Sequence, residues 1–378
     1  MGFSIGFAWF VLAPLVPSLI GLYKASLSEI IMLISLYGYA MVVVSLPAAW
    51  WAMKSGPKLL FTTAIVLSVL GLVLRAVSTH YSLLLIGQAI AALAYPMIIS
   101  PIGAVLKLTN HPRPRALTGW TIGMLFLGMA LGALVAPSLI ASLGTHGTLW
   151  VVALVNAVAG IYFLTALRYL PVPSAQTTIH RPLIITSWSL VGLAVASISV
   201  MLGSIAGEAL GKLGMSQSNS LALGSLLTAL TFLGSALGAI VLASLADRLS
   251  KPYQYQKVLA VLTWVALLWV ALTLTGKISG GPGGLEMGFF ILGALGNGWY
   301  AMALEASAHR AKTAGSAGIS TAGFSIVSNL GVALIPVYLG PLILSADSLW
   351  LTLTLLLMLI AVMVPLLAKH PEGTSRTA

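Results

Sequence analysis

Residues that could carry out chemistry are scarce in this sequence. Its 378 residues include no cysteine and six histidines, and only 7% of the residues are charged. The histidines are scattered and form no His-x-x-x-His pair, so neither a thiol nucleophile nor a clustered metal site is expected. The sequence also shows no phosphate-binding glycine loop and no catalytic triad. We therefore predict that the protein is not an enzyme and uses no cofactor and no metal.

Ionisable side chains within the long apolar segments are few, and such residues are costly to place in lipid. Glu305 lies one to two helical turns before Arg310, and Asp247 and Arg248 follow another apolar segment. Ion pairs among such residues can hold one face of a membrane protein closed. We predict that a gate on that face contains Asp247, Arg248, Glu305 and Arg310.

Four further ionisable residues lie near segment ends on the opposite face: Glu29, Arg75, Glu208 and Lys212. Glu208 and Lys212 are four residues apart, a spacing at which side chains pair on a helix. We interpret Glu208 and Lys212 as an interfacial pair.

Neutral polar and aromatic side chains supply most of the hydrogen-bonding groups in the apolar segments. This composition favours a pocket for a neutral or weakly cationic, partly apolar solute. The first, fourth, fifth and eleventh segments have no carboxylate near their middle. This absence favours facilitated movement of the solute across the membrane, without a proton relay. A proton- or ion-coupled exporter and a non-transporting receptor stay open as alternatives. The candidate lining residues are Gln88, Tyr95, Asn156, Asn297, Trp299, Tyr300, Ser325 and Asn329.

The elements that must position these residues follow from composition. Hydrophobic residues make up 59% of the chain and its mean hydropathy is +1.05. Soluble domains carry roughly 25% charged residues, so lipid must be the solvent for most of this chain. The net charge of +11 lies in short loops, which argues against nucleic acid as a partner.

The apolar runs predict an all-α membrane protein with twelve transmembrane helices, each needing about 20 residues to cross a bilayer. The expected helices cover residues 3–22, 28–53, 59–78, 82–107, 117–143, 148–169, 184–211, 218–245, 257–276, 286–308, 315–344 and 348–368.

Lysine and arginine identify the cytoplasmic face. Fourteen of the 18 fall in loops or the tail on one face, from Lys54 and Lys58 to Arg376, and four fall on the other: Lys24, Arg75, Lys212 and Lys277. Such a bias marks the cytoplasmic side. Both termini are therefore expected in the cytoplasm, as in a multi-pass protein of the plasma membrane.

A polar stretch at residues 170–183 divides the chain into two six-helix, pseudo-symmetric bundles. We expect an N-terminal bundle at 1–169, a cytoplasmic linker at 170–183, a C-terminal bundle at 184–369 and a tail at 370–378. The turn at residues 54–58 is echoed by the turn at 247–251. Repeats of this kind place a small-molecule site near the midplane between the halves. One chain, as a monomer in the bilayer, is expected to suffice.

Several stretches resemble the major facilitator superfamily. The sequence Ala246-Asp247-Arg248 is similar to its loop motif, whereas Met53 stands where the first copy has aspartate. The glycines of the fifth expected helix, Gly123, Gly128 and Gly132, with Pro137, resemble its Gly/Pro motif, and we assign them to helix packing. The resemblance implies alternating access, with helices 1, 4, 7 and 10 lining the path.

Longer stretches resemble the feline leukaemia virus subgroup C receptor-related branch: residues 46–50, 71–75, 86–92, 245–253 and 289–305. That branch is associated with choline and ethanolamine transport and with proposals of haem transport. The resemblance places Trp9, with Tyr37 nearby, at an aromatic position that can hold a quaternary ammonium by cation–π attraction. Trp9 could equally be an interfacial anchor. At the positions of the branch's two pocket glutamines this sequence has Phe126 and Ser325. The position of the branch's helix 7 tyrosine falls near Ser199, so the aromatic cage is incomplete.

Overall fold

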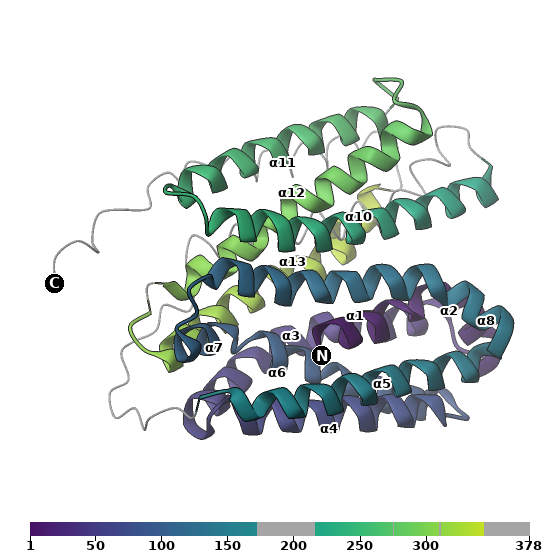
Figure 1. The fold of residues 1–378 in the computed structure, drawn as a ribbon. Helices are drawn as coiled ribbons and strands as arrows, with labels where there is room; N and C mark the ends of the chain where they lie inside the picture. The colour runs from purple at the N-terminus through teal and green to yellow at the C-terminus, as the bar shows by residue number, and fades with distance from the viewer. Residues whose placement is uncertain (172–215, 275, 310, 344–378) are drawn as a thin grey trace.

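The computed structural model describes residues 1–171, 216–274, 276–309 and 311–343, and every regular element in them is helical (Figure 1). Two groups of helices lie side by side, and we refer to them as the N-terminal and C-terminal halves (Figure 1). The N-terminal half contains α1 (Gly2–Phe10), α2 (Leu12–Tyr23), α3 (Leu27–Ser55), α4 (Pro57–Ala76), α5 (Tyr81–Ala92), α6 (Ala94–Ile99), α7 (Ile102–Thr109), α8 (Pro114–Ala166) and the 3-10 turn η1 (Leu167–Tyr169). The C-terminal half contains α10 (Gln217–Ala246), α11 (Pro252–Leu274), α12 (Gly281–His309) and α13 (Ala314–Ile343).

These helices confirm the predicted all-α membrane architecture. Within the described residues, seven helices are long and apolar enough to cross a membrane, or eight if the bent pair α1 and α2 counts as one span. The fifth and sixth predicted helices form the continuous element α8, which turns back at Gly144 with φ of +68°. Glycine adopts such a φ without strain. The predicted helices 184–211 and 348–368 lie outside the described residues.

Two predicted helices are broken, which the sequence analysis did not anticipate. The first consists of α1 and α2, which meet at Val11 with a bend of 44°. Pro14 and Pro17 lack the N–H groups that would bond the carbonyl oxygens four residues earlier, which weakens the helix at this point. The fourth consists of α5, α6 and α7, with interruptions at Leu93 and at Ser100–Pro101. These breaks expose backbone carbonyl groups to side-chain donors.

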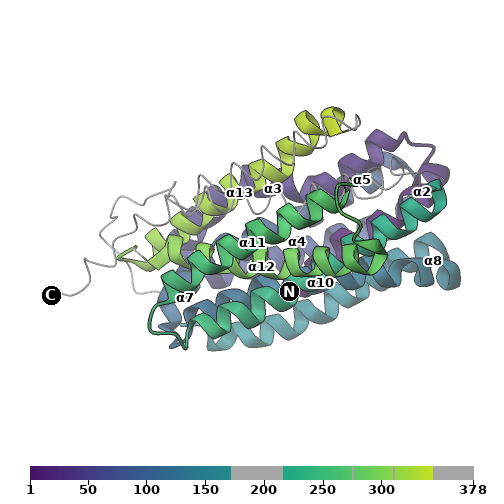
Figure 2. The same cartoon turned by 90° about the horizontal axis from the view of Figure 1, so that it is seen from above.

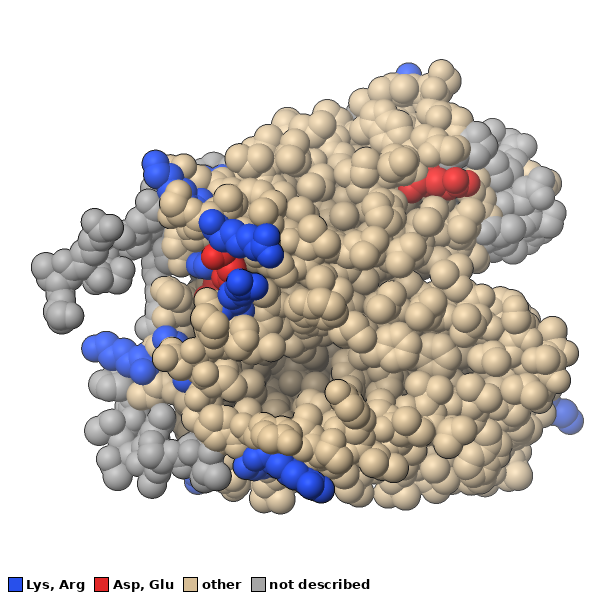
Figure 3. Space-filling view, in the orientation of Figure 1, with Lys and Arg blue, Asp and Glu red and all other residues tan. Residues whose placement is uncertain are grey.

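Lysine and arginine gather at one end of the molecule (Figure 3). We call it the basic end and define it by Lys54, Lys107, Arg113, Arg115 and Lys251, which lie in or next to the end turns of α3, α7, α8 and α11. The charge bias predicts that the basic end faces the cytoplasm.

The two halves meet mainly along α10 and α13 of the C-terminal half. Helix α10 packs against α8, and α13 packs against α3 and α7 (Figures 1 and 2). A Cβ atom added to Gly119 of α8 would lie 2.2 Å from the Ala239 carbonyl oxygen of α10, so only glycine permits this approach. Gly103 of α7 approaches Ala317 of α13 in the same way, with 2.4 Å to its carbonyl oxygen. Both close approaches lie on the basic-end side of the halves.

Packing also explains the other predicted glycines of α8. A Cβ at Gly128 would lie 2.0 Å from the Phe3 carbonyl oxygen, and one at Gly132 would lie 2.8 Å from that of Phe7. Gly123 instead faces Ala236 and Ile240 of α10. The packing role expected for these glycines is therefore confirmed, and it extends across both faces of the helix.

Candidate functional site

Three aromatic side chains of the N-terminal half form one cluster between the halves. Trp9 stacks on Tyr37 with ring centroids 4.9 Å apart and an interplanar angle of 13°. Its ring also lies 5.3 Å from that of Tyr95, tilted by 56°. The indole Nε1 donates a hydrogen bond of 2.7 Å to the Ile34 carbonyl oxygen. Trp9 is 7% exposed, so it lies inside the molecule rather than at an interface with lipid headgroups.

The C-terminal half meets this cluster with its own aromatic rings. Phe232 of α10 contacts Phe10 of α1 edge-on at 4.4 Å and lies 6.0 Å from Phe126 of α8. Tyr300 of α12 lies 5.1 Å from Phe324 of α13 and shares a hydrogen bond of 3.2 Å with Ser328. The aromatic rings at this contact therefore come from both halves.

Unpaired polar atoms accompany the rings of the C-terminal half. The Trp299 indole Nε1 and the Ser325 hydroxyl are buried, and neither has a hydrogen-bond partner. Nearby, Asn329 donates to the Ser325 carbonyl oxygen at 2.9 Å. Buried polar groups are nearly always paired, so unpaired donors beside a cluster of aromatic rings suit a ligand that brings its own hydrogen-bonding atoms.

Three predicted lining amides are already engaged within one half. Gln88 accepts a hydrogen bond of 2.8 Å from Arg75 and donates one of 2.9 Å to the Leu33 carbonyl oxygen. Asn297 donates to Ser235 at 2.7 Å, which ties α12 to α10. Asn156 likewise donates to Ser4 at 3.1 Å. Each amide joins neighbouring helices of the same half.

The structure buries Arg75, which the sequence places near a helix end. This side chain is fully buried, at 0% exposure, and its Nη1 donates to the Ala8 carbonyl oxygen at 3.0 Å. The position near a helix end was visible in the sequence, whereas its burial against α1 and α5 was not. Glu208, Lys212 and Ser199 lie outside the described residues.

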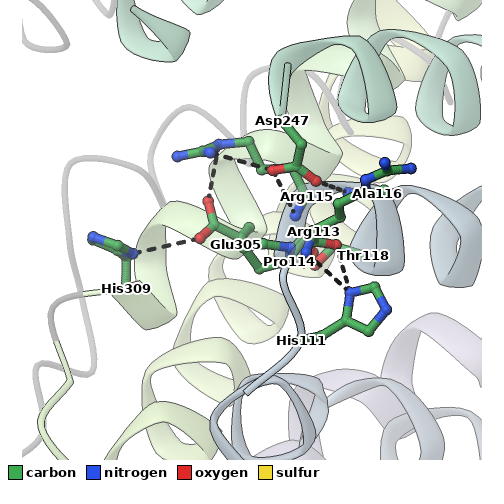
Figure 4. A network of polar contacts seen from close by, with 9 residues as sticks. All are labelled: His111, Arg113, Pro114, Arg115, Ala116, Thr118, Asp247, Glu305 and His309. Carbon is green, nitrogen blue, oxygen red and sulfur yellow. Dashed lines mark hydrogen bonds and ion pairs between the residues drawn. The ribbon is translucent and has the colours of Figure 1, made fainter. Parts of the chain in front are cut away.

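A network of ion pairs closes the basic end (Figure 4). Asp247, at the end of α10, accepts a hydrogen bond of 2.7 Å from the Ala116 backbone N–H in the first turn of α8. Its other oxygen lies 3.3 Å from Arg115 Nη1. Arg115 Nε lies 3.4 Å from Glu305, and Glu305 lies 3.6 Å from His309. Arg115 therefore joins the N-terminal half to two helices of the C-terminal half.

Two of the four predicted gate residues belong to this network, and Arg115 is a member that the sequence analysis missed. Asp247 and Glu305 have side chains only 2% and 4% exposed. Arg248 is exposed beside them and belongs to none of these ion pairs, so its place in the gate stays a prediction. Arg310 lies outside the described residues. Arg115 had been counted only as a loop charge, because nothing in its local sequence indicates a partner more than 100 residues away.

Polar contacts also join α7 to α12 and α13 near the basic end. Lys107 donates to the His309 carbonyl oxygen at 3.3 Å, and the Gly103 N–H donates to Thr321 at 3.3 Å. The polar contacts described between the halves thus lie at the basic end, and the aromatic contacts are those of Phe232 with Phe10 and Phe126. No group of three or more metal-ligating His, Cys, Asp or Glu side chains exists among the residues that the structure describes.

Comparisons with known proteins agree with this architecture. The Major Facilitator Superfamily model matches residues 1–336. A bacterial homologue of the iron transporter ferroportin, in an outward-facing state, superposes with a TM-score of 0.73 at 14% identity, covering 97% of each chain. The fucose:proton symporter of E. coli gives 0.68 at 14% identity, with 98% of each chain covered. The proton:xylose symporter bound to 6-bromo-6-deoxy-D-glucose gives 0.71 at 14% identity, covering 96% of this chain and 92% of the other. A comparison with curated protein sequences finds no match.

Proposed function

The chain belongs to the major facilitator superfamily of membrane transporters, and from this premise we propose that it carries a small polar organic solute by alternating access. The single observation that carries the proposal is the aromatic and polar cluster between two halves that are closed at the basic end. In alternating access, rocking of the halves exposes a midplane site to each side in turn. The proposed solute contacts are Trp9, Tyr37, Tyr95, Phe126, Trp299, Tyr300 and Ser325.

The contacts at the basic end support an outward-facing assignment for this conformation. Opening that end would separate Arg115 from Asp247 and Glu305, and would part α8 from α10 at Gly119. Those contacts include the ion pairs of Arg115, which can break and reform, and the close backbone approach of α8 to α10 at Gly119. Two solved structures with the same fold, the ferroportin homologue and the fucose symporter, were determined in outward-facing states.

The cluster favours a solute with hydrogen-bonding groups over a choline-like cation. Trp9 stacks on Tyr37, so that face of the indole is covered, while Trp299 and Ser325 offer unpaired donors. The choline or amine substrate implied by the branch resemblance stays a second candidate, with Trp9 as its cation–π partner.

We propose that transport is facilitated rather than driven by protons. Among the described residues, the carboxylate most deeply buried in a span is Glu305, which is engaged with Arg115 and His309 at the basic end. A coupled exporter is the alternative, since two of the structurally similar proteins are proton symporters.

Uptake into proteoliposomes tests the proposal. We expect saturable uptake of a defined solute mixture, unchanged by a proton ionophore. Loss of uptake on adding the ionophore would favour the coupled exporter. Binding by thermal shift without any uptake would instead favour the non-transporting receptor.

We further propose that the protein works as a monomer in the plasma membrane, with the basic end in the cytoplasm. One chain supplies both halves of the cluster, so no second copy is required. The charge bias between the two faces supports the orientation.

A further inference from the structure

Arg75 is the one fully buried cation among the residues that the structure describes, and the contacts above leave it without a role in the gate. Its Nη1 bonds to two neutral acceptors, the Ala8 carbonyl oxygen and Gln88 Oε1. Its Nε and Nη2 atoms are buried with no hydrogen-bond partner. Arginine stays protonated in proteins, so this position carries a full positive charge.

No described carboxylate neutralises that charge. Asp247 and Glu305 are paired at the basic end, and Glu29 caps the start of α3 through Ser26. Glu286 lies in the first two turns of α12, in the other half. Buried charges are normally paired because leaving them unpaired in a low-dielectric interior is costly. An unpaired guanidinium inside a membrane protein therefore points to a role that needs the charge.

The charge lies directly behind the aromatic cluster. Ala8, which accepts from Arg75, precedes Trp9 in α1, and Leu33, which accepts from Gln88, precedes the Trp9 acceptor Ile34 in α3. The Arg75–Gln88 pair thus fixes the backbone that holds Trp9 and places a positive charge beside the same wall.

We propose that Arg75 sets the substrate class of the site by its charge, so that organic cations are excluded and neutral or anionic solutes are accepted. This inference rests on the proposed transport function. Two unit charges ~10 Å apart at an effective dielectric constant of ~20 repel enough to reduce occupancy by about tenfold. A neutral solute feels no such penalty, and an anionic one is attracted.

A purely structural role for Arg75 gives a different result. If the side chain only ties α1, α4 and α5 together, its loss lowers the uptake of every solute by the same factor. If the charge selects, the ratio of cation uptake to neutral uptake changes. The ratio therefore separates the two roles even where the variant is less stable.

The test uses proteoliposomes and a defined mixture of small metabolites with equal numbers of cationic, neutral and anionic members, quantified inside the vesicles by mass spectrometry. The mixture includes a matched set: choline, its uncharged isostere 3,3-dimethylbutan-1-ol and the anion 3,3-dimethylbutanoate. We expect the wild type to take up the cationic members about tenfold less readily than the neutral ones. In Arg75→Gln, the cation-to-neutral ratio should rise about tenfold, whereas Arg75→Lys, which keeps the charge, should keep the wild-type ratio.

Two results overturn the inference while leaving transport intact: uptake of cations by the wild type as readily as of neutral solutes, or an unchanged ratio in Arg75→Gln. Arg75→Lys and the wild-type panel decide the question if Arg75→Gln fails to fold. No uptake of any charge class by the wild type would refute the proposed function itself, and this inference with it.

Discussion

Replacing Asp247 with asparagine should weaken the closure of the basic end. Asp247 lies in the C-terminal half, yet it accepts a 2.7 Å hydrogen bond from the Ala116 N–H at the start of α8. It therefore caps a helix of the opposite half, and its side chain is only 2% exposed. An asparagine side chain at this position would keep an oxygen acceptor but lose the charge.

The size of the effect follows from these contacts. A hydrogen bond to a charged group contributes about 1.5–3 kcal/mol, and a carboxylate at a helix N-terminus about 0.3–1 kcal/mol. Because asparagine retains part of the hydrogen bond, we expect a net loss of about 2 kcal/mol, or roughly a 30-fold lower ratio of closed to open basic end.

Spin labels can measure that ratio, because the chain has no native cysteine to interfere. Exposed Ser55 and Ser250 lie at the basic end, one in each half, and exposed Thr79 and Ser279 lie at the opposite end. With cysteines at the first pair, Asp247→Asn should lengthen the distance distribution. With cysteines at the second pair, it should shorten the distribution as the halves rock.

Arg248→Gln is the matched control, since Arg248 is the exposed neighbour of Asp247. A surface change of this kind should alter stability by less than about 0.5 kcal/mol. If Asp247→Asn leaves both distributions unchanged, or if Arg248→Gln shifts them equally, then the capping contact does not hold the basic end closed.

Three further predictions concern the helix contacts and the cluster. Gly119→Ala should open the basic end as Asp247→Asn does, because overpacking a close contact costs about 1–3 kcal/mol. Gly21→Ala is the control, since nothing lies within 4 Å of a Cβ atom added there. Equal spin-label distances in the two variants would count against the reasoning. Ser325→Ala should change the thermal unfolding temperature little, because the Ser325 hydroxyl has no hydrogen-bond partner to lose. The same variant should raise KM for the transported solute about tenfold, which corresponds to the loss of ~1.4 kcal/mol of binding free energy. An unchanged KM would remove Ser325 from the site. Trp9→Phe should lower the free energy of unfolding by about 0.5–1.5 kcal/mol, because the indole hydrogen bond to the Ile34 carbonyl oxygen is lost. Unfolding that matches the wild type in denaturant titrations would contradict this.

Much of the site was visible in the sequence as residue types but not as an arrangement. Aromatic and amide residues in apolar segments marked Trp9, Tyr95, Tyr300 and Asn297 as candidates. Their neighbours depend on which helix faces meet, so the structure alone separates Asn297, bonded within its half, from Ser325, which is unpaired. The branch resemblance also stays a prediction, because the superfamily match does not reach that level.

The sequence by itself determined that lipid surrounds this protein, where most helices begin and end, and which end is basic. These are local properties, because hydropathy and loop charge are read over about 20 residues at a time. The tertiary structure decided the partners. Arg115 and Glu305 are 190 positions apart and meet because glycines such as Gly119 let the halves approach closely. The burial of Arg75 was decided in the same way: its place near a helix end is a fact of the sequence, while its isolation from every described carboxylate follows from how the surrounding helices pack.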